Sequence, residues 1–324
     1  MPKAMIVQET GGPEVLKAVN IKKPTDPKPG QVLLKHTAIG VNYLDIYYRN
    51  GIYTVPKYPM IPGMEGCGIV EAVGKGVNIP IGKKVIYATA QTGSYCEYRL
   101  INANHLVGVP ESIPDDIAVA AFTKALTAHY MLFRAYSLRR GQTILVHAAA
   151  GGVGGLMTQM AKYAGAIVIG TVSSQEKAKA ARQNGCDHVI IYTEQDFSQE
   201  VMRITDNVGV HVVYDGVGKD TFKKSIACVM ERGLLVTTGQ PSGSIPPFNI
   251  LSIAQKSIYL TRPTLMIYTK DPREYMLSAI EVFTMIDKKV IKPKIFAKYP
   301  LEKAAEAHAA IESRKTIGSS ILIP

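Results

Sequence analysis

A glycine-rich turn at residues 147–154, His-Ala-Ala-Ala-Gly-Gly-Val-Gly, constrains the fold of this chain more than any other feature. An apolar, β-branched stretch at 143–148 precedes the turn, and a stretch rich in Ala, Met and Leu at 153–164 follows it. A second β-branched stretch comes at 167–172. A strand, a turn of small residues, a helix and another strand predict a βαβ unit, and such a unit requires a parallel sheet.

Strand and helix patterns continue to alternate beyond this unit. A helix is expected over 175–184, with Gly185 as its C-terminal cap. Further β-branched stretches predict strands at 188–192, 208–215 and 233–239. Strands that alternate with helices indicate a parallel sheet covered by helices on both faces, so the centre of the chain is expected to have an α/β fold.

The two ends of the chain have a different pattern. Short apolar stretches such as 31–35 and 85–88 lie between turns rich in Pro and Gly, which predicts a small β-barrel or sandwich. Pro114, followed by two Asp residues, marks the start of a long buried helix. Near the C-terminus, helices are expected at 272–286 and 301–313 and a strand at 319–323. A β-rich beginning and a separate tail therefore enclose the α/β centre.

Composition limits the classes of protein to which this chain can belong. Its 324 residues suffice for two domains, and 47% hydrophobic with 19% charged residues is typical of a globular protein. It contains no run of 18 apolar residues, and its N-terminus lacks the apolar core of a signal peptide. Four distant cysteines without a CxxC pair predict reduced thiols in the cytoplasm. The formal charge of +11 admits a nucleotide, a nucleic acid or a membrane surface as an anionic partner.

The residues after the second strand bear on which dinucleotide the turn would bind. An NAD site usually carries Asp or Glu here, about 20 residues after the turn, to bind the ribose hydroxyls. This chain has Ser173 and Ser174, with Lys177 nearby, and Glu176 is expected to be occupied in a capping box that begins at Ser173. Two hydroxyls and a lysine suit a 2′-phosphate better, which predicts NADP(H) rather than NAD(H). An ordinary βα turn and a merely solvated Lys177 are the alternatives.

Several motifs together resemble one family. The residues Gly141-Gln142, Leu145, Ala149–Gly154, Gln159 and Lys162 are similar to the signature of the quinone oxidoreductase/zeta-crystallin branch of the medium-chain dehydrogenases/reductases. Matches at 11–16, 40–45, 213–218, 261–263 and 318–324 extend the resemblance over essentially the whole chain. The resemblance implies a GroES-like catalytic domain in two parts, 1–124 and 267–324, around a doubly wound Rossmann NADP(H)-binding domain at 125–266. It also implies a homodimer, with the cofactor in the cleft between the domains.

The resemblance assigns a cofactor site residue by residue. The nicotinamide end would lie near Asn42, Asp45, Thr127 and Tyr130, and the pyrophosphate at Gly152 and Val153. The 2′-phosphate would lie near Ser173, Ser174, Lys177 and Tyr192. The rest of the cofactor would be lined by Val217, Gly239, Gln240, Pro241 and Arg314. The pair Gln240-Pro241 differs from the Asn-Ser pair expected in close relatives.

The positions that bind zinc in related enzymes carry other residues in this chain. Zinc-dependent members of the superfamily have a Cys in the segment matching 40–45 and a Gly-His-Glu motif, whereas this chain has Asn42 and Met64 there. Neither side chain holds zinc as a thiolate or imidazole does, and Glu65 alone does not make a site. The lobe with four structural cysteines is missing too, so Cys67 and Cys96 are expected to be packed residues. No metal is therefore expected.

Without zinc, the expected reaction is one that needs no polarising metal. A quinone accepts hydride or electrons from NADPH directly, so the first hypothesis is a zinc-independent NADPH:quinone reductase, acting by two-electron or one-electron transfer. Asn42 and Thr127 would position the nicotinamide. Tyr53 would hydrogen-bond to or stack on a flat substrate ring, unless it is simply a surface tyrosine. No general acid is identified.

Two alternatives stay open from the residues alone. The first is reduction of activated C=C bonds in enals or enones, which would use the same cofactor residues. The second is a non-enzymatic RNA-binding or crystallin-like protein, which the basic charge would favour. Lys and Arg residues are scattered, however, and no RNA-binding motif is found. The expected partner is therefore a small electrophile, and neither nucleic acid nor a membrane.

Overall fold

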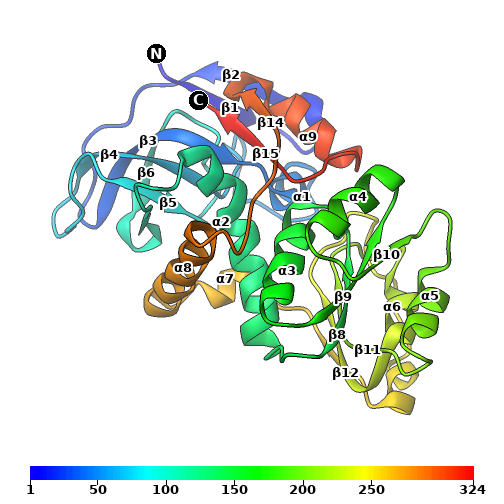
Figure 1. Ribbon diagram of the computed structural model, residues 1–324. Helices are drawn as coiled ribbons and strands as arrows, with labels where there is room; N and C mark the ends of the chain where they lie inside the picture. Colours follow the sequence, from blue (N-terminus) through cyan, green and yellow to red (C-terminus); the bar gives the residue numbers. More distant parts are fainter. The chain divides into compact units, whose positions relative to one another are not determined.

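The computed structural model describes residues 1–324, and the chain divides into two compact units. The first unit contains residues 1–123, 269–287 and 293–324, and the second contains residues 124–268 and 288–292. The first unit is therefore discontinuous in sequence: in Figure 1 it carries both the blue start and the red end of the chain. The helices are all too short or too polar to span a lipid bilayer.

A six-stranded parallel sheet forms the centre of the second unit. Its strands are β8 (Thr143–His147), β9 (Ile167–Val172), β10 (His188–Ile191), β11 (Val210–Asp215), β12 (Val229–Thr237) and β13 (Tyr259–Thr261). They lie in the order β10-β9-β8-β11-β12-β13. The order reverses between β8 and β11, which is where open α/β sheets bind their ligands. The α/β fold predicted for the centre of the chain is thus confirmed.

Helices cover both faces of this sheet (Figure 1). They are α3 (Gly152–Tyr163), α4 (Gln175–Gln183), α5 (Phe197–Ile204) and α6 (Phe222–Cys228), followed by the short helices η4 (Ile250–Lys256) and α7 (Leu265–Tyr268). Alternate strand residues, among them Leu145, Ile169 and Val213, are fully buried in one cluster with Phe197 and Phe222. Because side chains alternate along a strand, the residues between them face the opposite layer, which explains the nearly continuous apolar strands.

The first unit is built on a seven-stranded sheet and a two-stranded sheet. The small sheet pairs β1 (Lys3–Val7) with β2 (Leu16–Asn20). The large sheet has β14 (Ile295–Pro300), β15 (Ser319–Ile323), β3 (Gln31–Gly40), β4 (Gly66–Val73), β5 (Lys84–Tyr87) and β7 (Val107–Gly108) in this order, and β6 (Tyr98–Asn102) also pairs with β3. Because β15 pairs with β3, the β-rich start and the tail of the chain share one sheet.

Strand β3 is longer than the 31–35 segment that the sequence predicted. Its pairing with β4 shifts register between Leu33 and Leu34 and again between His36 and Ala38. His36 is buried in the middle of the strand, where its ring nitrogens bond to Cys96 O and Tyr87 Oη, both at 2.7 Å. Irregular pairing and a buried polar residue remove the alternation of period two that identifies a strand in a sequence.

The remaining α-helices are α1 (Tyr43–Arg49), α2 (Asp115–Tyr130), α8 (Pro272–Asp287) and α9 (Ala304–Glu312). Short helical turns also lie at η1 (Pro13–Val15), η2 (Ala103–His105) and η3 (Met131–Ala135). The boundary between the units at residues 123 and 124 falls within α2. In the first unit, the Phe122 ring of α2 stacks on the Phe283 ring of α8 with 5.2 Å between centroids. The predicted helix 301–313 begins as a separate 3₁₀ turn, Leu301–Lys303, before α9 starts.

All four cysteines are buried free thiols, namely Cys67, Cys96, Cys186 and Cys228. Burial raises the pKa of Cys67 and of Cys96 to about 12. Both thiols are therefore protonated at neutral pH, and protonated thiols are poor nucleophiles and poor metal ligands. Cys67 and Cys96 are packed residues, as the sequence predicted.

Candidate functional site

The glycine-rich turn joins β8 to α3 and leaves the start of that helix uncapped by any side chain. Ala148 has a φ of +53°, and its carbonyl oxygen accepts a hydrogen bond from Gly151 N at 2.8 Å. A Cβ atom at Gly154 would lie 2.4 Å from the same oxygen, so glycine is required where α3 passes the turn. The N–H groups at the first helical residues, Gly152 and Val153, can therefore bind a phosphate.

The residues assigned to a 2′-phosphate gather at the ends of β9 and β10. The two strands are parallel neighbours, and Tyr192 N donates to Val172 O at 3.0 Å. Thr193 Oγ1 donates to Ser173 O at 3.2 Å, so the two segments leave the sheet side by side. The carboxyl ends of β9 and β10 thus bring together hydroxyl groups from both segments. The first turn of α4, which contains Lys177, begins at the same end of the sheet.

Helix α4 does not begin with the predicted capping box. Its N-cap is Ser174, whose Oγ accepts a hydrogen bond from Lys177 N at 3.3 Å. The box predicted from Ser173 to Glu176 is wrong by one residue, because Ser173 still lies beside the segment that follows β10. The Ser174 hydroxyl is therefore partly committed to the helix, while the Ser173 hydroxyl does not cap it.

The loops that follow β11 and β12 lie against each other in the second unit. Ser242 N donates to Val217 O at 3.1 Å, and a Cβ atom at Gly239 would lie 2.6 Å from Gly216 O. The residues assigned to the cofactor from these loops are Val217, Gly239, Gln240 and Pro241. Both loops follow the carboxyl ends of adjacent parallel strands, which is the edge where such sheets bind nucleotides.

Sequence reasoning missed Asp215, the residue that shapes the first of these loops. Its buried carboxylate accepts hydrogen bonds from Val217 N at 2.9 Å and from Gly218 N at 3.1 Å. Ser225 Oγ donates to the other carboxylate oxygen at 2.8 Å and lies 2.9 Å from His147 Nε2. Because the serine has one hydrogen, His147 is the donor in that second bond. An Asp directly before Gly-Val-Gly at the end of an apolar strand was the available signal.

Thr127 and Tyr130 lie on α2 within the second unit. The Tyr130 ring stacks on the Tyr268 ring with 4.4 Å between centroids, and its hydroxyl donates to Pro263 O at 3.5 Å. Burial raises the pKa of Tyr130, so its hydroxyl stays protonated near neutral pH. Thr127 lies about one turn earlier and is half-buried. Both side chains can orient a ligand, but the Tyr130 ring face toward Tyr268 is already occupied.

Asn42 is the N-cap of α1, and its side chain is hydrogen-bonded to the buried carboxylate of Glu65. Asn42 Nδ2 donates to Glu65 Oε2 at 2.7 Å, and Thr123 N donates to Glu65 Oε1 at 2.8 Å. Glu65 is fully buried, and a Cβ atom at Gly40 would lie 2.0 Å from its Oε2 atom. Glu65 therefore fixes the carboxamide of Asn42, a function that the sequence alone did not reveal.

Asp45 lies behind Asn42 rather than at the surface of the unit. It is fully buried, and its Oδ2 atom accepts hydrogen bonds from Asn42 N at 2.9 Å and from Tyr95 Oη at 3.1 Å. A carboxylate in this environment acts mainly on the residues it holds. Asp45 thus orients the start of α1 through these hydrogen bonds.

Tyr53 belongs to a group of tyrosines around α1. Its ring lies 5.4 Å from the Tyr47 ring and 5.7 Å from the Tyr48 ring, in edge-to-face arrangements, and Tyr53 N donates to Tyr47 O at 2.9 Å. Tyr53 is half-buried, so its ring is positioned and still reachable. Arg314 follows α9 with a φ of +57°. The candidate site residues of the first unit are Asn42, Asp45, Tyr53 and Arg314, and the others belong to the second unit.

The residues at the superfamily's catalytic zinc position do not fit a zinc ion. Met64 offers only a thioether and is 4% exposed, and the Asn42 amide already donates to Glu65. Zinc sites in proteins need thiolate, imidazole or carboxylate ligands in tetrahedral sets. No group of three or more His, Cys, Asp and Glu side chains in this chain is arranged to hold a metal ion.

Comparison with known proteins places these features in a family. Residues 28–139 match the alcohol dehydrogenase GroES-like domain, and residues 152–281 match the domain described as zinc-binding dehydrogenase. A quinone oxidoreductase of Pseudomonas aeruginosa is 43% identical over 100% of both chains. A 2-haloacrylate reductase of Burkholderia sp is 39% identical over 100% of this chain and 99% of that protein.

A solved structure agrees with the sequence comparisons. The crystal structure of Escherichia coli quinone oxidoreductase complexed with NADPH superposes with a TM-score of 0.97, at 41% identity, over 99% of this chain and 100% of that chain. Full-length coverage includes both the GroES-like part and the parallel sheet. The chain belongs to the quinone oxidoreductase branch of the medium-chain dehydrogenase/reductase superfamily.

Proposed function

We propose that this chain is a zinc-independent reductase that transfers electrons from NADPH to a quinone. The observation that carries the proposal is the end of β9, where Ser173, Ser174 and Lys177 stand in place of the acidic residue of NAD sites. The NADPH bound in the structure of the Escherichia coli relative supports the cofactor. Full-length relatives named quinone oxidoreductase support the substrate class.

The cofactor would be held mainly by the second unit. Its pyrophosphate would bind the N–H groups of Gly152 and Val153, where the helix dipole favours an anion. The 2′-phosphate would be bound by Ser173, Ser174, Lys177 and Tyr192. The rest of the cofactor would contact Thr127, Tyr130, Val217, Gly239, Gln240 and Pro241 of this unit. Asn42 and Arg314 are the candidate cofactor contacts of the first unit, and the buried Asp45 would act through Asn42.

Lys177→Ala should reduce the affinity for NADPH by about tenfold or more, because a charge-assisted hydrogen bond is worth about 1.5–3 kcal/mol. The affinity for NADH, which lacks the 2′-phosphate, should change by less than about twofold. Both constants can be measured by titration of the dihydronicotinamide fluorescence. Lys179→Ala on the exposed face of the same helix is the control. An equal loss for both cofactors would contradict a phosphate contact by Lys177.

The chain's own residues would orient the reactants rather than exchange protons. Bound NADPH supplies the reducing equivalents, as a hydride or as single electrons. Asn42, fixed by Glu65, and Thr127 would position the nicotinamide and the acceptor. Tyr53 would offer its hydroxyl and ring to the flat quinone. A quinone is already electron-poor, so this arrangement works without a Lewis acid, and water can protonate the product.

A second candidate substrate class comes from one relative. The 2-haloacrylate reductase of Burkholderia sp is 39% identical over the whole chain, and its substrate carries an activated C=C bond. Reduction of enals or enones by this chain would use the same cofactor residues. The two candidates differ in the acceptor alone.

Stopped-flow oxidation of NADPH against quinones, enals, enones and alcohols, with and without a chelator, tests the proposal. Quinones are expected to be the fastest acceptors, and the chelator is expected to leave the rates unchanged. Faster reduction of enones than of any quinone would favour the second candidate. Alcohol oxidation that the chelator abolishes would refute the zinc-independent mechanism, and a lack of turnover with every electrophile would favour a binding protein.

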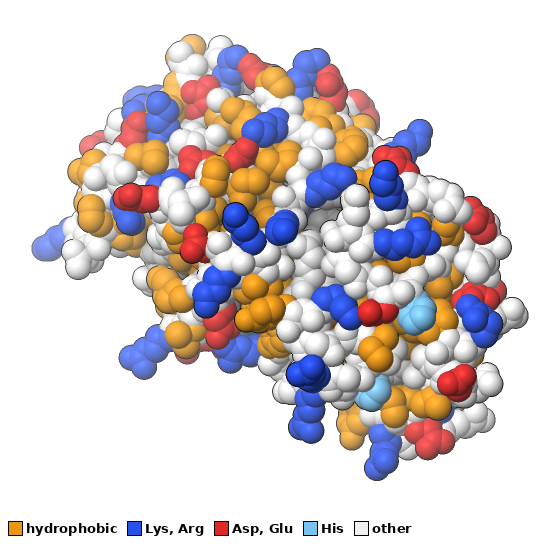
Figure 2. Space-filling model, viewed as in Figure 1, with side chains coloured by type: hydrophobic (Ala, Val, Ile, Leu, Met, Phe, Trp, Pro, Cys, Tyr) orange, Lys and Arg blue, Asp and Glu red, His pale blue; other side chains and the backbone are white.

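The surface charges support a small-molecule partner rather than a nucleic acid. Figure 2 shows Lys and Arg side chains spread over the visible face, with Asp and Glu side chains among them. Several lysines form ion pairs, as in Lys23–Glu71 and Lys298–Asp116. Nucleic-acid-binding proteins instead cluster their basic residues on one face or stripe.

The proposed protein partner is a second copy of this chain. β13 pairs only with β12, so its other edge is open, and Tyr259 on it is 67% exposed. Leu251 of η4, just before β13, is 70% exposed. Pairing between two β13 strands would extend the sheet and cover these apolar side chains.

Light scattering is expected to report a mass twice the 35.2 kDa of the chain. Leu251→Glu combined with Tyr259→Lys should shift the protein toward the monomer, because charges replace apolar side chains at the open edge. Tyr163→Glu, at an exposed residue of α3, should leave the mass unchanged. A monomeric wild type would exclude the dimer.

A further inference from the structure

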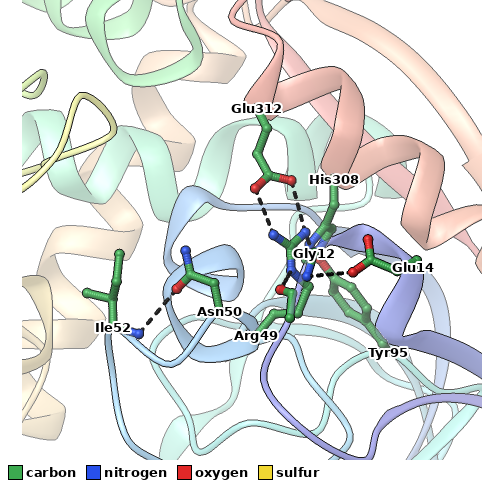
Figure 3. Close-up of polar contacts among 9 residues, drawn as sticks. Gly12, Glu14, Arg49, Asn50, Ile52, Tyr95, His308 and Glu312 are labelled. Carbon is green, nitrogen blue, oxygen red and sulfur yellow. Dashed lines mark hydrogen bonds and ion pairs between the residues drawn. The ribbon is translucent and has the colours of Figure 1, made fainter.

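A line of buried polar side chains connects helix α9 to the start of α1 within the first unit. Figure 3 shows three of its members, Arg49, His308 and Tyr95. Arg49, His308 and Tyr95 are each no more than 1% exposed. Arg49 Nη1 lies 3.2 Å from His308 Nδ1, and His308 Nε2 lies 2.9 Å from Tyr95 Oη. Tyr95 Oη in turn donates to Asp45 Oδ2 at 3.1 Å. Four side chains, two from α1 and one each from the segments around Tyr95 and His308, thus form one hydrogen-bonded series.

The donors and acceptors in this series run in one direction. Arginine can only donate, so His308 Nδ1 is the acceptor of the Arg49 bond. His308 therefore carries its proton on Nε2 and donates it to Tyr95 Oη, which leaves the tyrosine hydrogen for Asp45. Burial and the Arg49 charge lower the pKa of His308 to about 3, so the ring is neutral at physiological pH. His308 and Tyr95 thus each have one proton arrangement in which the hydrogen bonds to both of their neighbours form.

The series ends on the backbone of Asn42. The Asp45 oxygen that accepts from Tyr95 also accepts from Asn42 N at 2.9 Å, and Asp45 N donates to Asn42 O at 3.0 Å. One carboxylate oxygen thus links the Tyr95 hydroxyl to the backbone of Asn42. The Asn42 side chain is held separately, by Glu65.

The other end of the series is anchored by two segments that are remote in sequence. Glu312 near the end of α9 accepts two hydrogen bonds from Arg49, at 2.7 and 2.9 Å, and Gly11 O accepts from Arg49 Nε at 3.1 Å. The paired bonds to the carboxylate restrict the plane of the guanidinium, as the close-up of Figure 3 shows. Arg49 is thus a fixed starting point for the series.

We propose that Arg49, His308 and Tyr95 are positioning residues that hold Asn42 in the orientation used in NADPH oxidation. The proposal rests on the proposed function, because it takes Asn42 to be a residue that contacts the nicotinamide. None of the three needs to touch substrate or cofactor. Their effect passes through Asp45 to the backbone of Asn42, and it makes the C-terminal helix α9 a part of the catalytic arrangement.

Tyr95→Phe is the most direct test, because it removes only the hydroxyl at the centre of the series. The matched control is Tyr87→Phe, since Tyr87 is an equally buried tyrosine of the same unit whose hydroxyl bonds to His36 and Ser94. Tyr95→Phe is expected to lower kcat by about tenfold, because small displacements of reacting groups cost about that much or more. Tyr87→Phe should change kcat by less than about twofold, although it should lower the thermal midpoint about as much as Tyr95→Phe does.

A second pair of variants covers the case in which Tyr95→Phe does not fold. His308→Gln retains an N–H donor close to the position of Nε2, whereas His308→Leu has none. The glutamine variant is expected to keep a kcat at least about threefold higher than the leucine variant. Equal kcat values in two folded variants would show that the hydrogen bond to Tyr95 does not matter for the reaction.

Combination with Asn42→Ala separates this proposal from the proposed function. In that background, Tyr95→Phe is expected to lower kcat by less than about twofold further, because the group it orients is gone. If Asn42→Ala lowers kcat and Tyr95→Phe behaves like Tyr87→Phe, the positioning proposal is overturned and the proposed function stands. If Asn42→Ala leaves kcat unchanged, the assignment of Asn42 fails, and the positioning proposal fails with it.

Discussion

Replacing Gly154 with alanine is expected to reduce the affinity for NADPH by at least about tenfold and to lower the thermal midpoint. The added Cβ atom would lie 2.4 Å from Ala148 O and 2.9 Å from Ala148 C, and both are backbone atoms. A backbone cannot yield as the end of a side chain can, so α3 must move away from the turn. That movement carries the N–H groups of Gly152 and Val153 away from the proposed pyrophosphate position.

Gly151→Ala is the matched control for this change. Its Cβ atom would lie 3.2 Å from the same Ala148 oxygen, and its φ of −78° suits any residue. Fluorescence titration with NADPH should therefore show a much smaller loss of affinity for Gly151→Ala than for Gly154→Ala. Unchanged NADPH affinity in a folded Gly154→Ala protein would argue against phosphate binding at this turn.

Acid is expected to destabilise the first unit well above the pH at which its surface carboxylates titrate. Burial lowers the pKa of His36 to about 4, and burial with the Arg49 charge lowers that of His308 to about 3. An unfolded chain binds a proton on each near pH 6.5, so the stability is complete above that value and falls as the pH drops toward 4 and 3. At pH 4.5 each histidine costs about 2–3 kcal/mol of stability, out of a total of about 5–15 kcal/mol.

Chemical denaturation at pH 7.5, 5.5 and 4.5 measures this effect. The unfolding midpoint should fall steadily over this range. His36→Gln is expected to be less stable at pH 7.5, because it loses the bonds to Tyr87 and Cys96, but to have a shallower pH dependence. His188→Gln, at an exposed residue of β10, should keep the wild-type slope. A wild-type midpoint that is constant from pH 7.5 to 4.5 would contradict the buried neutral histidines.

The secondary structure could be predicted well where local patterns were regular. The strands predicted at 167–172 and 319–323 have the same bounds in the structure as β9 and β15, because each is a short β-branched or apolar run between breaker residues. Strand β3 was predicted only in part, because two register shifts and the buried His36 interrupt its pattern. The helix start at Ser173 was wrong by one residue, because contacts with the neighbouring segment decide where α4 begins.

The candidate site divides in the same way. The turn at 147–154 and the serines after β9 were identified from the sequence, because their chemistry depends on residues next to each other in the chain. In the sequence, Glu65 stood out only as the remaining residue of the Gly-His-Glu zinc motif. Its hydrogen bond to Asn42 joins residues 23 positions apart. The bond between Tyr95 and His308 spans 213 residues, and that between Arg49 and His308 spans 259. No local pattern relates residues so far apart.

From residue types and short spacings alone it follows that the centre of this chain is a βαβ arrangement with a glycine-rich turn. The same local patterns show serines and no acid at 173–174, directly after its second strand, and Asn42 and Met64 at the positions of zinc ligands. Each of these properties follows from residue type and short spacing. The folded structure was needed to identify the buried groups that hold Asn42, the histidines that are kept neutral, and the pairing of the tail with β3. Hydrogen bonds and desolvation depend on distances of a few ångströms between remote segments, and those distances exist only once the chain has folded.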